Sequence, residues 1–162
     1  MLTETLYSKI FGTAREKGLV YGISSGLSVN RDSSNWWFGV QVSEQNALAL
    51  MDIIYEQLQK VIKGDIQEED IEAAKLYSIG RFYRSAQTVG GTASWYSSKF
   101  FFDDSVYEYY KYPDRIAAIK KSDMIDIARS MFNANIWGLG LLGKSSKLFT
   151  EELKQKIAPL FS

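Results

Sequence analysis

The chain has 162 residues, of which 46% are hydrophobic and 23% are charged, enough apolar material for one domain with its own core. Its 19 basic side chains balance its 19 acidic ones, so no net positive charge favours a nucleic acid or an anionic membrane as partner. Cysteine and histidine are both absent, which excludes disulfides, a thiolate nucleophile and the usual nitrogen and sulfur ligands of zinc. The lack of cysteine fits a reducing compartment, and we expect a single domain, residues 1–162, located in the cytoplasm.

A helix that ends at a sharp corner is predicted at the start of the chain. Gly18 can take the positive φ that commonly follows a helix end, and alternating apolar and small or polar residues predict a strand over residues 19–29. Arg15, in the last helical turn, and Tyr21, in the strand, therefore flank one corner. The helix itself is indicated by apolar residues that recur at every fourth position, namely Leu2, Leu6, Ile10 and Ala14.

A hairpin and two long helices are expected next. Residues 30–34 are a polar turn, and residues 35–42 alternate as a second strand. Ser43 can cap a helix that Gly64 terminates. The acids at 68–70 favour the first turn of a third helix, which we expect to run to Thr88.

The second half of the chain is predicted to be mainly helical. The two glycines at residues 90–91 are expected to break the third helix, and short aromatic-rich helices are expected at residues 92–102 and 106–112. Pro113 suits the start of a helix to residue 120, and Ser122 can cap a helix to Phe132. A short strand at residues 136–142 and a last helix at residues 150–157 complete the order. This order predicts an α+β fold with a small, mainly antiparallel sheet and helices packed on one face.

The corner segment Arg15-Glu16-Lys17-Gly18-Leu19-Val20-Tyr21 resembles the opening of the C-terminal, non-zinc-binding half of pitrilysin or insulinase-family metallopeptidases. An Arg-Glu-x-x-Gly-Leu-x-Tyr-like segment follows the first helix of that half. Residues 43–64, 64–75 and 122–128 resemble its long helix, its acidic helix start and its late helix, so the resemblance covers nearly the whole chain. In this chain Arg15 and Tyr21 are one residue closer together than is usual, and the strand that normally precedes the first helix is absent. The resemblance thus implies a pitrilysin-like domain truncated at its first strand.

The resemblance also implies a function. Peptidases of that family bind zinc with a His-x-x-Glu-His helix, which a chain without histidine cannot form. A non-catalytic, substrate-binding domain is therefore implied, without a cofactor of its own and with no activity by itself. Its implied partners are a peptide substrate and a companion zinc-binding half, on the same longer chain or on a separate subunit. The alternative is a structural or interaction subunit of the same fold that has no role in proteolysis.

Arg15 and Tyr21 are the candidate substrate-binding residues that the resemblance implies. A guanidinium and a phenol can donate hydrogen bonds to a peptide oxygen that gains negative charge during hydrolysis. A second interpretation stays open, in which Arg15 only complements the helix end and Tyr21, on the same strand face as Leu19 and Ile23, is a half-buried core residue.

Two other patterns allow a binding function. Residues 138–145 satisfy the G-x-x-x-x-G-K-S pattern of a phosphate-binding loop, although the glycines also suit close packing within the predicted strand. Aromatic residues are dense over residues 95–112, interleaved with Lys99 and Lys111. Because no basic stripe accompanies them, we expect core packing, with a protein partner surface as the second interpretation.

Overall fold

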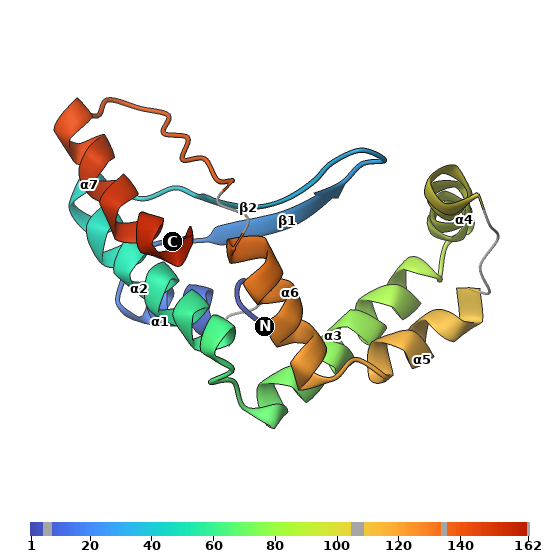
Figure 1. Ribbon diagram of the computed structural model, residues 1–162. Helices are drawn as coiled ribbons and strands as arrows, with labels where there is room; N and C mark the ends of the chain where they lie inside the picture. Colours follow the sequence, from blue (N-terminus) through green and yellow to red (C-terminus); the bar gives the residue numbers. More distant parts are fainter. Residues whose placement is uncertain (5–7, 105–108, 134–135, 162) are drawn as a thin grey trace. The chain divides into compact units, whose positions relative to one another are not determined.

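The computed structural model describes residues 1–4, 8–104, 109–133 and 136–161, and the elements within them follow one another in the order shown in Figure 1. The strands are β1 (Ile23–Val29) and β2 (Ser34–Val40). The α-helices are α1 (Lys9–Glu16), α2 (Glu44–Lys63), α3 (Glu68–Ser85), α4 (Val89–Asp103), α5 (Tyr112–Ala117), α6 (Lys121–Phe132) and α7 (Lys147–Ile157). Two 3₁₀ turns, η1 (Tyr109–Lys111) and η2 (Ala158–Phe161), adjoin α5 and α7.

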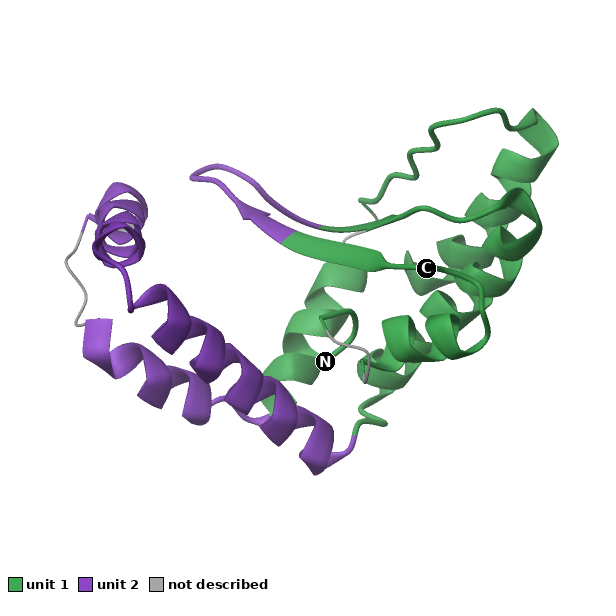
Figure 2. Cartoon of the chain, turned by 180° about the vertical axis from the view of Figure 1, so that it is seen from behind, with its two compact units in different colours: residues 1–26, 37–66, 121–162 green, residues 27–36, 67–120 purple. Residues whose placement is uncertain are grey.

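The chain divides into two compact units, coloured separately in Figure 2. The first unit comprises residues 1–26, 37–66 and 121–162, and the second comprises residues 27–36 and 67–120. The boundary falls within the hairpin, so the outer part of both strands counts with the second unit. That the whole chain acts as one domain stays a prediction.

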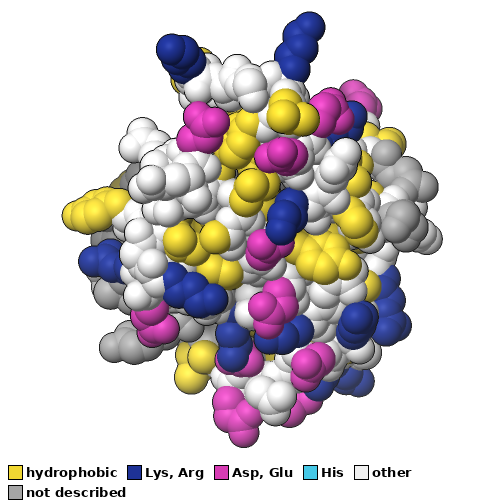
Figure 3. Space-filling view, turned by 90° about the vertical axis from the view of Figure 1, so that its left-hand side faces the viewer, with side chains coloured by type: hydrophobic (Ala, Val, Ile, Leu, Met, Phe, Trp, Pro, Cys, Tyr) yellow, Lys and Arg dark blue, Asp and Glu magenta, His cyan; other side chains and the backbone are white. Residues whose placement is uncertain are grey.

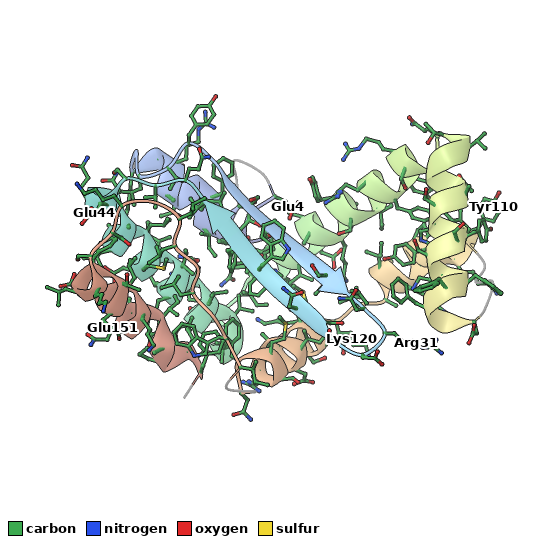
Figure 4. The ribbon with its side chains drawn as sticks, turned by 90° about the horizontal axis from the view of Figure 1, so that it is seen from above. Glu4, Arg31, Glu44, Tyr110, Lys120 and Glu151 are labelled. Carbon is green, nitrogen blue, oxygen red and sulfur yellow. The ribbon has the colours of Figure 1, made fainter. Side chains whose placement is uncertain are left out.

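The predicted hairpin is confirmed as a two-stranded sheet of β1 and β2. The Asn30 amide donates to the Ser33 carbonyl at 2.9 Å, and so short a connection makes the strands antiparallel. Figure 4 labels Arg31 in this turn. Gly26 makes room for an indole across the hairpin, because a Cβ there would come within 2.7 Å of Trp37 Cζ2. The α+β class predicted from the sequence is confirmed.

The predicted start of the first strand and the predicted third strand are wrong. β1 begins at Ile23 instead of residue 19, and the Leu19 amide and carbonyl make hydrogen bonds with Ala14 and Asn46 instead of with a neighbouring strand. Residues 136–142 are not a strand. Strands need partners for their backbone groups, and the glycines at 138 and 140 lower strand propensity. The segment instead exposes the side chains of Ile136 and Leu142, by 87% and 107%.

The core of the first unit is built on α2, whose apolar face is buried as the helical period predicts. α1, α6 and α7 each pack against it. Lys156 Nζ of α7 pairs with Asp52 Oδ1 of α2 at 2.5 Å, and Arg129 Nε of α6 donates to a carbonyl near the end of α2 at 3.0 Å. Gly64 ends the helix with a φ of +80°, which confirms the predicted stop. The buried residues of α2 are Ala47, Leu50, Ile53, Ile54, Leu58 and Val61.

The second unit contains an aromatic core. The Phe82 ring lies 4.4 Å from the Tyr109 ring, and the Trp95 ring lies 4.9 Å from the same ring. Core packing is thus confirmed for these rings, whereas Tyr110, labelled in Figure 4, is 86% exposed. Phe100 and Phe101 of α4 are also exposed.

Several predicted boundaries in the second half are wrong for local reasons. The glycines at 90–91 lie within the first turn of α4, because Thr88 caps that helix by accepting the Gly91 amide at 3.0 Å. α6 begins one residue before its predicted cap, and α7 begins at Lys147 because Ser146 Oγ accepts the Phe149 amide at 3.1 Å. Residues 105–108, 134–135 and Leu6 of the first predicted stripe lie outside the described residues. Each helix in the described ranges is too short or too polar to span a bilayer.

Candidate functional site

The corner between α1 and β1 is a Schellman motif. Gly18 has a φ of +66°, its amide donates to the Arg15 carbonyl at 2.9 Å, and the Leu19 amide donates to the Ala14 carbonyl at 2.9 Å. Asn46 Nδ2 of α2 donates to the Leu19 carbonyl at 3.4 Å, which links the corner to the core helix. The predicted positive φ of Gly18 is confirmed, and the helix that contains Arg15 ends two residues before this glycine.

The structure brings Arg15 and Tyr21 together at this corner. Arg15 Cζ lies 5.6 Å from the centroid of the Tyr21 ring, within the range of a cation–π contact. The Tyr21 side chain is 89% exposed, so its interpretation as a half-buried core residue is wrong. That interpretation relied on a regular strand from residue 19, whereas the strand begins at Ile23 and the alternation of faces does not extend back to Tyr21.

The N–H groups of the Arg15 guanidinium donate no hydrogen bond to the described residues. Its contacts with the described residues are those with two aromatic rings, Tyr21 and Phe11, the latter at 5.9 Å. Neither ring accepts a conventional hydrogen bond, so the fork of N–H groups stays available for an oxygen atom of a ligand. Phe11 was not among the residues selected from the sequence, although its position four residues before Arg15 on a helix indicates contact.

A shallow depression of about 420 Å³ lies beside the corner. Its lining comes from the two chain segments that flank the hairpin, namely Gly18, Leu19, Val20, Tyr21, Gln41, Val42 and Ser43. Tyr21 is thus both a partner of Arg15 and part of a hollow surface. The arrangement can present a charged donor and a hydroxyl donor to a ligand that lies across the corner.

The described residues do not fit a metal centre. Among them, no group of three or more acidic side chains is arranged to hold a metal ion, and the chain has no histidine or cysteine. Zinc is bound in proteins mainly by histidine and cysteine, with carboxylates as further ligands. No step of any reaction is therefore assigned to a metal held by this chain.

The pattern at residues 138–145 does not have the geometry of a phosphate-binding loop. Such a loop joins a strand to a helix whose first turn contains the Lys-Ser pair. Here residues 136–142 are not a strand, and α7 begins after Ser146, beyond both Lys144 and Ser145. The prediction that the glycines pack within a strand is also wrong.

Charges of both signs are interspersed on the face of the molecule in Figure 3. The ion pair of Lys60 with Glu56 is one such surface contact. The hydrogen bond from Lys60 Nζ to Glu56 Oε1, 2.8 Å long, lowers the pKa of Glu56 and raises that of Lys60. The pair lies one turn apart on α2, outside the residues that line the depression.

Comparison with known proteins supports the sequence resemblance. Residues 1–77 match the sequence model of a family described as the peptidase M16 inactive domain. No curated protein matches the chain significantly.

Three solved structures share the fold. A conserved protein from Enterococcus faecalis V583 matches 78% of the chain with a TM-score of 0.67 and 17% identity. A protease from Helicobacter pylori matches 80% with a TM-score of 0.63 and 16% identity. A "putative zinc protease" from Bordetella pertussis Tohama I matches 80% with a TM-score of 0.61 and 15% identity.

The chain spans only 30% and 32% of the first two of these structures, and 71% of the third. It therefore corresponds to one part of larger proteins of this fold. The family match includes the whole corner from Phe11 to Tyr21. The first 77 residues of the chain are therefore similar to the inactive domain of the peptidase M16 family, and the fold of the chain is one that proteins described as proteases share.

Proposed function

We propose that this chain is the substrate-binding, non-catalytic domain of a zinc metalloendopeptidase, and that it encloses and orients a peptide for hydrolysis in a companion domain. The observation that carries the proposal is the exposed pair of donors at the corner. Arg15 has no hydrogen-bonding partner among the described residues, and Tyr21 is 89% exposed beside a depression. The similarity of residues 1–77 to the inactive domain of a peptidase family supports the reaction class.

The two donors suit the chemistry of peptide hydrolysis. When a nucleophile adds to a peptide carbonyl, negative charge develops on the carbonyl oxygen, and fixed donors directed at that oxygen stabilise it. Arg15 would supply a charged donor and Tyr21 a neutral one, from the two sides of one turn. A zinc ion in the companion domain would supply the activated water, since this chain has no ligand set for it. The companion is either another part of the same chain or a separate subunit.

The test is peptide hydrolysis by this chain mixed with a companion half that carries His-x-x-Glu-His. We expect hydrolysis only in the mixture with zinc. Arg15→Ala should lower kcat/KM by about 10²-fold, as loss of one donor to the developing oxyanion does. Tyr21→Phe, which removes only the hydroxyl, should lower it as well.

Arg31→Ala is a matched control, because Arg31 is an exposed arginine in the hairpin turn, outside the depression. It should leave hydrolysis unchanged. If Arg15→Ala and Tyr21→Phe both retain full activity while the chain still binds its companion tightly, the substrate-binding role is wrong. The domain would then be a structural subunit of the same fold.

A further inference from the structure

The aromatic ring of Phe11 lies next to the proposed donor pair, although neither the family resemblance nor the sequence pattern assigns it a role. Phe11 and Arg15 are four residues apart on α1 and therefore share one face of the helix. Arg15 Cζ is 5.9 Å from the Phe11 ring centroid and 5.6 Å from the Tyr21 ring centroid. The guanidinium is thus shared between two rings.

The three side chains differ in how firmly the fold holds them. Tyr21 is 89% exposed, and its ring lies against the Arg15 guanidinium. Arg15 is also exposed, and its own contacts there are the two rings. Phe11 is half-buried, on a helix whose neighbouring residues Ile10 and Ala14 are completely buried. The half-buried Phe11 ring can therefore restrict the rotamers of Arg15, and Arg15 can in turn restrict those of Tyr21.

We propose that Phe11 is a positioning residue, whose ring fixes the Arg15 guanidinium and, through it, the Tyr21 ring in the arrangement that receives a substrate oxygen. The last part of this inference depends on the proposed function, whereas the positioning itself does not. A long arginine side chain in water samples many rotamers, and a donor that is already placed loses less entropy when it binds. The rings hold the guanidinium without using its hydrogen-bond donors, since a cation–π contact engages the ring face.

The first experiment measures the positioning in this chain alone, by NMR. The Arg15 δ-protons should be displaced upfield by the two rings. Phe11→Leu removes one ring and keeps an apolar side chain, and Tyr21→Leu removes the other. If Phe11 positions Arg15, Phe11→Leu abolishes nearly the whole displacement, and adding Tyr21→Leu changes little more. If the double variant loses as much of the upfield displacement as the two single variants lose together, each ring contributes only its own ring current. Phe11 then does not position Arg15, and the proposal is overturned.

Two further variants control for general damage to the fold. Phe11→Tyr keeps the ring and should restore the displacement. Phe149→Leu removes another half-buried phenylalanine from a helix of the same unit and should leave the Arg15 resonances unchanged. Circular dichroism of each variant shows whether the fold is retained. A displacement that Phe11→Tyr does not restore contradicts the proposal.

The second experiment uses the complex with the zinc-binding companion. Phe11→Leu should lower kcat/KM by about two- to fivefold, the worth of one exposed cation–π contact, and Phe11→Tyr should recover it. If the NMR result is as expected but Arg15→Ala and Phe11→Leu both retain full hydrolysis, the positioning stands and the proposed function fails. If Arg15→Ala lowers hydrolysis but Phe11→Leu changes neither the spectrum nor the rate, the proposed function stands and the positioning role fails.

Discussion

The corner that presents Arg15 and Tyr21 depends on the backbone of Gly18, and a matched pair of alanine substitutions measures that dependence. Gly18 has a φ of +66°, whereas Gly22 lies outside the left-handed region. A Cβ on either residue would meet no heavy atom within 4 Å, so neither substitution creates a clash. The two glycines flank Tyr21 and differ in backbone conformation, not in available space.

The expected difference follows from two known effects. Alanine restricts the unfolded chain and thereby stabilises the native state by about 0.4–1 kcal/mol, a gain common to both variants. Alanine in the left-handed conformation is less favourable by roughly 1–2 kcal/mol, a strain that only Gly18→Ala introduces. Gly18→Ala should therefore be less stable than Gly22→Ala by about 1–2 kcal/mol, or about 2–8 °C in Tm for a chain of this length.

The assay is urea unfolding followed by circular dichroism, with Tm measured in parallel. Equal m-values for the two variants would show that the same surface is exposed on unfolding in both. Gly18→Asn is a useful third variant, because asparagine tolerates the left-handed region, and its stability should lie between those of wild type and Gly18→Ala. Equal stability of Gly18→Ala and Gly22→Ala would refute the reasoning that strain at this corner requires glycine.

Three other predictions test the packing and the surface charges. Leu153→Ala, at a side chain only 1% exposed, should lower the unfolding free energy by about 2–5 kcal/mol, whereas Leu142→Ala, at a fully exposed side chain, should change it by less than about 0.5 kcal/mol in the same urea titration. Gly91→Ala forces a Cβ against a backbone carbonyl oxygen of α3 and should lower the unfolding free energy by about 1–3 kcal/mol. Gly90→Ala meets open space and should raise the unfolding free energy by up to about 1 kcal/mol, and differential scanning calorimetry can distinguish the two variants. Glu56→Gln should slightly lower the unfolding free energy at neutral pH and leave it unchanged in acid. A carboxyl whose pKa is lowered by folding stabilises the protein above its unfolded pKa of 4.5, and this stabilisation is lost as the pH falls through the folded pKa. A loss of stability in urea titrations that persists in acid, or that added salt does not reduce, would contradict this.

The long helices could be predicted from the sequence because their signals are local. One apolar stripe predicts α2, and Gly64 predicts its end, because glycine takes the left-handed conformation at no steric cost. The acidic first turn of α3 and the proline at the start of α5 are equally local signals. The same holds for the Gly18 corner, because the two backbone hydrogen bonds that form it span only a few residues.

The candidate site was only partly predictable. The resemblance of the corner segment indicated Arg15 and Tyr21 as binding residues. The alternation of strand faces alone predicted a half-buried Tyr21, because it assumes a strand that starts directly after the corner. The Leu19 amide instead takes part in the Schellman motif, the strand begins only at Ile23, and the Tyr21 side chain is exposed. Phe11 could have been found from its spacing to Arg15, although a lone aromatic residue one turn before a cation is common on helices.

Local patterns along this chain determine that helices end at Gly18 and Gly64, that a hairpin follows the first helix, and that no histidine or cysteine is available for a metal. They could not decide whether residues 136–142 form a strand, because a strand exists only when a neighbour pairs with its backbone groups. Nor could they decide which aromatic residues of residues 95–112 are buried and which are exposed, since burial depends on contacts between segments that are distant in sequence, as between Phe82 and Tyr109. The contact of Arg15 with Tyr21 also needed the structure, because strand alternation alone had placed the Tyr21 side chain in the core.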